Sequence, residues 1–180
     1  MKWYQYRITD STNNQAKRFL DSYKKVETPI VITSLKQTEG RGTRGRDWYS
    51  ESSEGLYLSI LINRPKIQFF DQIEYVHQKV AEHIVSSVYE ITGVTLDIKW
   101  PNDLMLNKKK CGGILFDTQS EGNNAYPSSV ITGIGLNINQ GNFPDSLSEI
   151  ATSIFKETQK RYELYKFVRP ISRRVIQFMT

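Results

Sequence analysis

The residues of this chain best suited to chemistry are arginines and lysines that stand beside glycines. The segment EGRGTRGRDWYS (39–50) contains three glycines and three arginines: Gly40, Gly42, Gly45, Arg41, Arg44 and Arg46. Glycine permits close approach of a bound group to the backbone, and arginine presents a fixed fork of donors that suits phosphate or carboxylate. A loop of this composition can close over an anionic intermediate and exclude water. By itself, the segment fits a surface turn with solvated arginines better.

The glycine spacing in this loop matches G-x-G-x-x-G, but its context does not fit a dinucleotide site. Such a site needs a helix that starts at the third glycine and an acidic residue about 20 positions later. The residues after Gly45 predict no helix, and the later region is the apolar run LSILIN (58–63). A P-loop is also excluded, because Arg46 and Asp47 follow Gly45 where Lys and Ser or Thr are required.

Three further stretches carry groups that can bind ligands. KWPNDL (99–104) combines a cation, an aromatic ring and two oxygen-bearing side chains at the end of a predicted strand. KKKCGGILFD (108–117) leads from lysines into two glycines and an apolar strand, and GIGLNIN (133–139) is a strand with glycines that admit a ligand to the backbone. Taken singly, each also fits a simpler structural role: a Pro-Asn-Asp turn, an exposed hairpin tip, or a strand packed closely on a helix.

The elements that must position these residues follow from hydrophobic periodicity. Strands are predicted at residues 2–8, 29–35, 55–63, 94–99, 103–107, 112–118 and 129–137. Helices are predicted after the capping residues 10–13, over 69–91 and over 164–178. Several strands in hairpin-like succession with about three helices favour an α+β fold, in which a largely antiparallel mixed sheet is covered by helices. We expect one domain over residues 1–180.

Composition narrows the class of protein. The chain has 38% hydrophobic, 24% charged and 12% aromatic residues, which is typical of a globular domain, and no apolar run approaches a membrane span. One cysteine, Cys111, excludes an internal disulfide framework, and we expect a cytoplasmic protein. The net charge of +5 is concentrated after residue 155, where a solvated helix face is the simplest explanation. Cys111 fits a packing role, and His77 and His83 lie too far apart around a helix to share a metal.

Together and in this order, Ser11-Thr12-Asn13, Gln37, GRGTRGRDW, KWPNDL, KCGGIL and GIGLNIN resemble the catalytic domain of the biotin protein ligases, over about residues 8–155. The resemblance implies the class II synthetase-like fold of biotin and lipoate ligases. It also implies ATP-dependent activation of biotin to biotinyl-5′-adenylate, followed by transfer to a lysine of a biotin carboxyl carrier domain. Mg²⁺ is expected to arrive with ATP, not as a tightly bound metal.

The resemblance also implies roles for individual residues. Those expected to be catalytic are Lys110, Arg44 and Arg46. Those expected to bind biotin are Ser11, Thr12, Asn13, Gln37, Gly40, Arg41, Gly42, Thr43, Lys110 and Gly113. Those expected to bind ATP or the adenylate are Arg41, Arg44, Arg46, Trp48, Asn102, Lys110 and Asn137. Asp103 is the candidate ligand for Mg²⁺.

The sequence departs from the family pattern in three places. Thr43 replaces an arginine or lysine that is common in the glycine-rich loop, which weakens the expected retention of the adenylate. We expect neither an N-terminal helix-turn-helix nor a small C-terminal β-barrel, so DNA binding is not expected, whereas a homodimer is plausible for this family. Two alternatives stay open: a lipoate or other acyl-protein ligase on the same fold, and a non-catalytic ligand-binding module that uses the basic tail.

Overall fold

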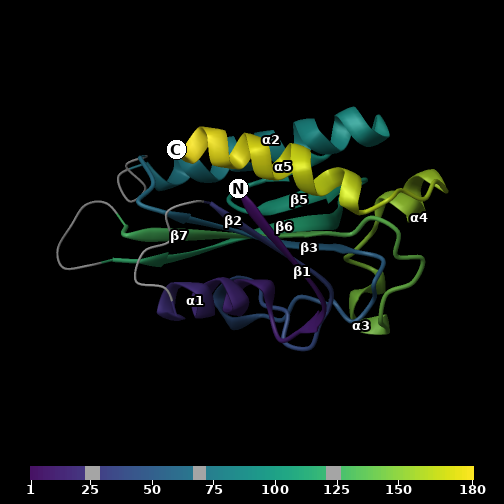
Figure 1. Ribbon diagram of the computed structural model, residues 1–180. Coiled ribbons are helices and arrows are strands. Elements are labelled where there is room, and N and C mark those ends of the chain that lie inside the picture. Colours follow the sequence, from purple (N-terminus) through teal and green to yellow (C-terminus); the bar gives the residue numbers. More distant parts are fainter. Residues whose placement is uncertain (23–28, 67–71, 121–126) are drawn as a thin grey trace.

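A single mixed sheet runs through the centre of the computed structural model, which describes residues 1–22, 29–66, 72–120 and 127–180 (Figure 1). Its strands are β1 (Lys2–Thr9), β2 (Ile30–Gln37), β3 (Leu56–Asn63), β4 (Asp97–Lys99), β5 (Asp103–Leu106), β6 (Lys109–Gln119) and β7 (Ser129–Leu136). The helices are α1 (Thr12–Ser22), α2 (Ile73–Thr92), α3 (Asp145–Ser148), α4 (Ile154–Thr158) and α5 (Tyr165–Met179). A short 3-10 turn spans Thr43–Gly45.

The strand order confirms the predicted α+β class with a mixed, largely antiparallel sheet. The order across the sheet is β1-β2-β3-β7-β6-β5-β4. β1 and β2 are parallel, and the other five neighbouring pairs are antiparallel. The central strands β3, β7 and β6 pair over eight registered positions at each junction, so they form the rigid part of the sheet.

The observed bounds of five strands agree with the predicted ones to within two residues, and two strands differ by three or more residues in length. β4 is shorter than the predicted 94–99, because its partner β5 has only four residues and three of them pair with it. β6 begins at Lys109, earlier than the predicted 112, because Lys109 and Lys110 pair with β5. The short helices α3 and α4 were not predicted, since four or five residues carry too little periodicity to detect.

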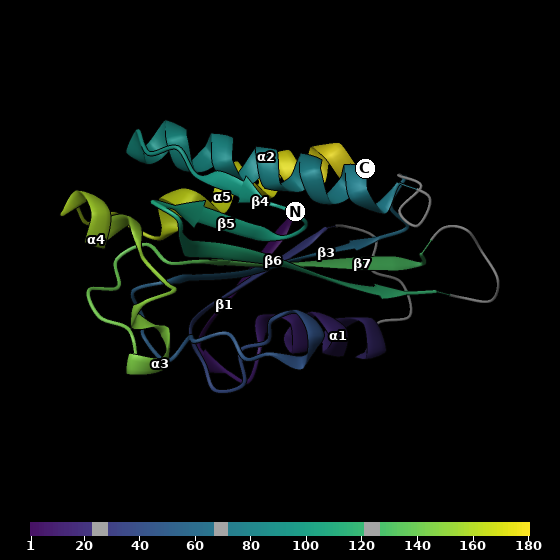
Figure 2. The ribbon, with the colours of Figure 1, turned by 180° about the vertical axis from the view of Figure 1, so that it is seen from behind.

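The helices cover the two faces of the sheet unequally. α2 and α5 lie side by side on one face, whereas α1 lies on the opposite face (Figures 1 and 2). The larger core lies under α2 and α5 and contains residues such as Leu58, Ile60 and Phe167. A small core under α1 contains Ala16, Ile30, Ile32, Leu61 and Ile131. The part of this second face that α1 leaves uncovered is where the site forms.

The predicted helices are observed, with small changes at their ends. α2 is described from Ile73, and residues 69–71 of the predicted helix lie outside the described part of the chain. α2 ends at Thr92 and is capped by Gly93, whose left-handed φ of 73° suits a glycine C-cap. α5 continues through Pro170 and buries Phe167, Ile171 and Val175. No helix in the described segments is long and apolar enough to cross a bilayer.

Candidate functional site

The candidate site lies on the α1 face of the sheet, where β3, β6 and β7 pass the start of α1. Every second residue of a strand points to the same face, so three strands contribute in parallel rows. The residues that they present here are Tyr57, Ser59, Gly113, Leu115, Asp117, Gly133 and Gly135. The glycines leave the backbone bare, so a flat group can lie directly on the sheet.

The start of α1 forms one wall of the site. Ser11, Thr12 and Asn13 are all buried, with 3–4% of each residue exposed. Gln37, at the end of β2, accepts a hydrogen bond through Oε1 from the Thr12 backbone N–H (2.8 Å) and lies 3.1 Å from Thr12 Oγ1. Ser59 Oγ lies 2.7 Å from Thr12 Oγ1 and donates to Asn13 Oδ1 (2.5 Å). The wall is therefore a connected set of donors and acceptors held at a helix N-terminus.

The glycine-rich loop folds back on itself as a narrow hairpin and does not open a helix. The Gly42 N–H donates to the Arg46 carbonyl (2.7 Å), and the Trp48 N–H donates to the Gly40 carbonyl (2.8 Å). A Cβ on Gly40 would lie 2.4 Å from the Trp48 carbonyl oxygen, so glycine is required there. Arg44 has a left-handed φ of 58°, uncommon for a residue with a Cβ, and places its side chain at the exposed tip. This geometry confirms that the loop is no dinucleotide fingerprint.

Trp48 returns from the loop and lies on the glycine floor. A Cβ on Gly135 would lie 2.5 Å from Trp48 Cε2, and a Cβ on Gly113 would lie 3.1 Å from Trp48 Cζ3. The Nζ of Lys110 lies 5.4 Å from the centroid of the indole ring, within the range of a cation–π contact. The indole of Trp48 therefore lies between the two hollows described below, and it belongs to the glycine-rich loop.

Lys110 is held in the site both by an ion pair and by its backbone. Its Nζ lies 2.6 Å from Asp103 Oδ1, and both side chains are partly exposed. Its backbone is fixed on the other side, because the Lys110 N–H donates to the Ile150 carbonyl and its carbonyl accepts from the Thr152 N–H. An ammonium group held by one carboxylate still has protons to donate to a ligand. Lys110 can therefore bind an anion without a change of its backbone.

Two adjoining hollows meet at Lys110. Residues that line the first hollow but not the second include Ser11, Thr12, Asn13, Gln37, Arg41, Tyr57, Asn102, Gly113 and Leu115. Residues that line the second but not the first include Arg46, Asp47, Tyr49, Asn137, Phe143, Leu147, Ile150 and Ala151. Four residues border both hollows: Gly42, Thr43, Trp48 and Lys110. The two hollows therefore share one wall, and Lys110 is the charged side chain among the four residues that form it.

Most of the residues predicted from the sequence line these two hollows, and three do not: Gly40, Arg44 and Asp103. Gly40 and Arg44 border the outer side of the loop instead. Arg46 faces the second hollow, and its guanidinium donates to the Thr43 backbone carbonyl and to Thr43 Oγ1. Asp103 reaches the site through its ion pair with Lys110. Arg44 can act on a ligand only if the tip of the loop moves inward.

The two asparagines predicted to bind nucleotide are buried and already engaged. Asn102 Nδ2 donates to the Ile114 carbonyl (3.2 Å) and lies 3.5 Å from Thr43 Oγ1. Asn137 Nδ2 donates to the Thr152 carbonyl (3.0 Å), and its Oδ1 accepts from Gln140 (3.2 Å). Each carbonyl oxygen has two lone pairs, so Asn137 Oδ1 can still accept one bond from a ligand. Both side chains also hold together the segments that frame the hollows.

The cysteine and the two histidines pack against apolar or aromatic side chains. Burial raises the pKa of the Cys111 thiol to about 12, and this side chain lies in the larger core. Burial lowers the pKa of His77, which packs on Phe116, whereas His83 packs on Phe178. Within the described residues, no three His, Cys, Asp or Glu side chains form a group that could hold a metal ion. Asp103 is thus the single predicted metal ligand that borders the site, and Lys110 already neutralises it.

Several lining residues were not predicted from the sequence. The apolar wall of the second hollow comes from Phe143, Leu147, Ile150 and Ala151, in and around α3. Tyr57 and Leu115 line the first hollow, and burial raises the pKa of Tyr57, which keeps its hydroxyl neutral and donating to the Ser52 carbonyl. Strand alternation could have identified Tyr57 and Leu115, but no local pattern places the α3 segment beside Lys110.

Comparison with known proteins agrees with this geometry. A model of the biotin/lipoate A/B protein ligase family matches residues 4–137. The bifunctional ligase/repressor BirA of Bacillus subtilis is 40% identical over 126 residues, which are 69% of this chain and 38% of that protein. The biotin–[acetyl-CoA-carboxylase] ligase of Paracoccus denitrificans is 28% identical over 146 residues, 77% of this chain and 54% of that protein. This chain therefore spans from 38% to 54% of the lengths of these two relatives.

Solved structures show the same arrangement of helices and strands. The biotin protein ligase from Aquifex aeolicus in complex with biotin and ATP superposes with a TM-score of 0.79 and 27% identity, covering 99% of this chain and 72% of that chain. The family model covers the strands and loops from which the first hollow is built, including Ser11, Gln37, Lys110 and Gly113. The chain belongs to the biotin/lipoate A/B protein ligase family.

Proposed function

We propose that this chain activates biotin with ATP to form biotinyl-5′-adenylate and transfers the biotinyl group to a lysine of a biotin carboxyl carrier domain. The observation that carries the proposal is the position of Lys110 on the wall shared by two hollows. Adenylation requires a carboxylate from one ligand to reach the α-phosphate of another, and a cation must lie between them.

The first hollow suits biotin. Biotin is an apolar bicycle with a polar ureido group and an acidic tail, so its site needs a polar end, an apolar wall and a cation at the exit. Ser11, Thr12 and Gln37 supply the polar end, and Tyr57 and Leu115 supply apolar surface. Lys110 supplies the cation. Gly113 and Gly135 allow the ligand to lie against the sheet once the indole of Trp48 moves aside.

The second hollow suits the nucleotide. Trp48, Tyr49 and Phe143 offer aromatic surface for a base, and the acceptor of Asn137 lies at its rim. Arg46 borders the same hollow, where it can bind the phosphates, and Arg44 can join it if the loop tip closes. Arginine forks suit phosphate oxygens in paired contacts.

The first step joins the two ligands beside Lys110. A carboxylate oxygen of biotin forms a bond to the α-phosphorus of ATP, the bond from that phosphorus to the bridging oxygen breaks, and pyrophosphate leaves with the electron pair. The Lys110 ammonium reduces repulsion between the attacking carboxylate and the α-phosphate, and Arg46 stabilises the charge on the leaving group. Asp103 orients the Lys110 side chain through its ion pair.

Mg²⁺ enters this scheme as part of the nucleotide. Mg²⁺ commonly binds through substrate phosphates, one or two carboxylates and its own waters. The donors present here, Asp103 and the carbonyl oxygen of Asn102, fit such a shared role better than a complete protein site. When bound with ATP, the ion would supply charge neutralisation on the phosphates.

The second step transfers the acyl group. The neutral amine of a carrier lysine attacks the acyl carbon of the adenylate, AMP leaves, and the amine loses a proton to solvent as the amide forms. The adenylate must stay bound until the carrier domain arrives, so the loop that contains Gly42 and Thr43 has to remain closed over it. Thr43 offers a hydroxyl where family members commonly have a cation.

The alternative within the family is a lipoate or other acyl-protein ligase, which the same fold can support. Exchange of labelled pyrophosphate into ATP separates the candidates. We expect exchange that depends on biotin and shows no stimulation by lipoate or octanoate. Exchange stimulated only by lipoate or octanoate would show that one of these acids, and not biotin, is the substrate. Ligand binding without any exchange would favour a non-catalytic module.

We expect a cytoplasmic protein with a carrier-domain partner and no affinity for DNA, and a homodimer is testable by light scattering. The identity of the carrier can be approached by incubating the protein with biotin, ATP and isolated carrier domains. Mass spectrometry would then locate the modified lysine.

A further inference from the structure

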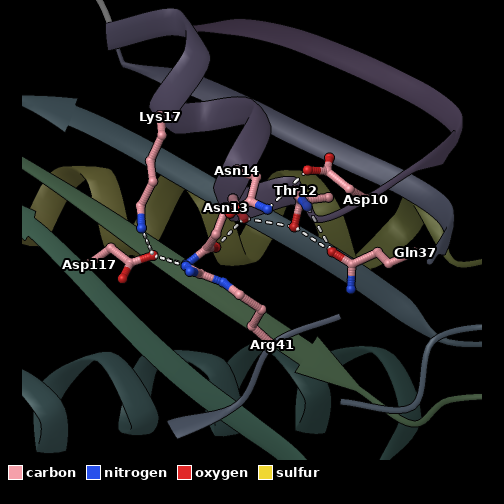
Figure 3. Close-up of polar contacts among 9 residues, drawn as sticks. Asp10, Thr12, Asn13, Asn14, Lys17, Gln37, Arg41 and Asp117 are labelled. Atoms are coloured by element: carbon pink, nitrogen blue, oxygen red, sulfur yellow. Dashed lines mark hydrogen bonds and ion pairs between the residues drawn. The ribbon is translucent and has the colours of Figure 1, made fainter. Parts of the chain in front are cut away.

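Asp117, on β6, is a carboxylate on which three donors from two other segments converge. The Arg41 guanidinium donates to its Oδ2 (2.6 Å), Asn13 Nδ2 donates to the same oxygen (3.0 Å), and Lys17 Nζ lies 3.2 Å from it. Figure 3 shows Lys17 reaching down from α1 and Arg41 reaching up from the loop to this one side chain. Asp117 thus links the sheet, the start of α1 and the glycine-rich loop.

Asp117 determines which way the Asn13 amide faces. An ionised carboxylate only accepts hydrogen bonds, so the Nδ2 end of Asn13 must point to Asp117. The Oδ1 end then points to Ser59 and accepts a hydrogen bond from its hydroxyl (2.5 Å). Ser59 Oγ also lies 2.7 Å from Thr12 Oγ1, so the contact continues from Asn13 into the rest of the polar wall. The carboxylate therefore sets which end of the Asn13 amide faces that wall.

Asp117 also fixes Arg41, the first arginine of the loop. Arg41 lines the first hollow, and its backbone forms an isolated antiparallel β-bridge with that of Asp47 across the loop. Holding the Arg41 side chain on β6 therefore holds both strands of the narrow hairpin over the first hollow. The remaining N–H groups of the guanidinium stay available to a ligand.

We infer that Asp117 is a positioning residue for the biotin site: it keeps Arg41 over the first hollow and orients Asn13 in its wall. The inference rests on the proposed function. Asp117 touches neither ligand in this scheme and acts through these two residues. Its loss should therefore speed release of biotin and raise KM for biotin, with much smaller changes in kcat and in KM for ATP.

Two matched variants separate positioning from general stability. Lys17→Met removes a cation from the same Asp117 oxygen, but Lys17 contacts neither the loop nor the hollow in this structure. Asp10→Asn breaks a comparable ion pair at the start of α1, where Asp10 accepts two hydrogen bonds from Arg18 (2.7 and 2.9 Å). Asp117→Glu keeps the negative charge and can restore the contact with Arg41.

The main experiment measures the dissociation rate of biotin by stopped-flow tryptophan fluorescence. For Asp117→Asn, we expect dissociation about tenfold faster than in the unmodified protein, the change that corresponds to loss of one charge-assisted hydrogen bond. KM for biotin in pyrophosphate exchange should rise by a similar factor, while kcat and KM for ATP stay within about threefold. Lys17→Met and Asp10→Asn should stay within about twofold, and Asp117→Glu should recover most of the loss.

A second readout needs no ligand. Trypsin cleaves after Arg41, Arg44 and Arg46, and Asp117→Asn should be cut in this loop several-fold faster than the unmodified protein. Dissociation and cleavage rates unchanged in Asp117→Asn would overturn the inference, as would an equal effect of Lys17→Met. If the unmodified protein shows no biotin-dependent exchange, the proposed function fails. The trypsin comparison then still decides whether Asp117 holds the loop.

Discussion

The two faces of the central sheet are made by the same strands but have opposite character. In β3, Leu58 and Ile60 point into the core under α2 and α5, whereas Tyr57 and Ser59 point to the site. In β6, adjacent residues separate in the same way: Cys111 is fully buried in the core, and its neighbour Lys110 borders both hollows. The pleat of the sheet therefore separates the residues that stabilise the fold from those that do chemistry.

The largest expected effect on the apolar face comes from Phe167→Ala. Phe167 is fully buried in the larger core, and its ring centroid lies 6.3 Å from that of Tyr162. Truncation should lower the free energy of unfolding by about 3–5 kcal/mol, because it removes buried surface and leaves a cavity. Urea denaturation measures this change. Biotin affinity of the folded fraction should stay within about twofold, and a large loss of affinity there would show that the two faces are coupled.

On the site face, Gly135→Ala should affect activity more than stability. Its Cβ would lie 2.5 Å from Trp48 Cε2 and would fill the bare floor on which the proposed ligand lies once the indole moves aside. We expect pyrophosphate exchange to fall about 100-fold, the order seen when a positioned group shifts by about 1 Å. Gly141→Ala is the matched control, because its Cβ would meet Phe155 at an ordinary 3.6 Å. Equal activity of the two variants would show that the ligand does not lie on Gly135.

The sequence predicted the strands and the motif residues of the site, but not every segment that surrounds them. Strand periodicity placed all seven strands, and the ordered motifs brought Ser11, Gln37, Lys110 and Gly113 into one site. The α3 wall was missed because backbone contacts between distant segments hold it there, such as the bond from the Lys110 N–H to the Ile150 carbonyl. The outward position of Arg44 depends on its positive φ, which no local pattern indicated.

Stability on the site face should depend on pH through Asp10. Its hydrogen bonds from Arg18, with further donors nearby, hold the pKa of Asp10 well below its usual range. A lowered pKa stabilises the folded state above the unfolded value of about 3.9, and this contribution is lost as pH falls below it. Asp10→Asn should cost about 1 kcal/mol at pH 7, given the partial exposure of the pair, and clearly less at pH 2, because the contribution is lost from about pH 3.9 down through the folded pKa. Thermal unfolding between pH 7 and pH 2 measures this, and a pH-independent cost would contradict it.

The smallest expected effect concerns Cys111. Burial raises the pKa of its thiol to about 12, so very little thiolate forms at pH 8. The folded protein should react with a disulfide reagent only slowly, whereas protein unfolded in urea should react at once. Cys111→Ala should leave pyrophosphate exchange within about twofold, although Cys111 is next to Lys110 in the chain. Rapid labelling of the folded protein with loss of activity would place the thiol in the site instead.

The central claim, that two ligands react across Lys110, is tested most directly by a single-turnover measurement of adenylate formation. Enzyme in excess over biotin is mixed with ATP and Mg²⁺ and quenched, and biotinyl-5′-adenylate is quantified by mass spectrometry. The account predicts nearly complete conversion of biotin by the unmodified protein. It predicts no detectable adenylate on the same timescale from Lys110→Ala, while Lys108→Ala behaves as the unmodified protein. Adenylate formation by a folded Lys110→Ala at the unmodified rate would contradict it.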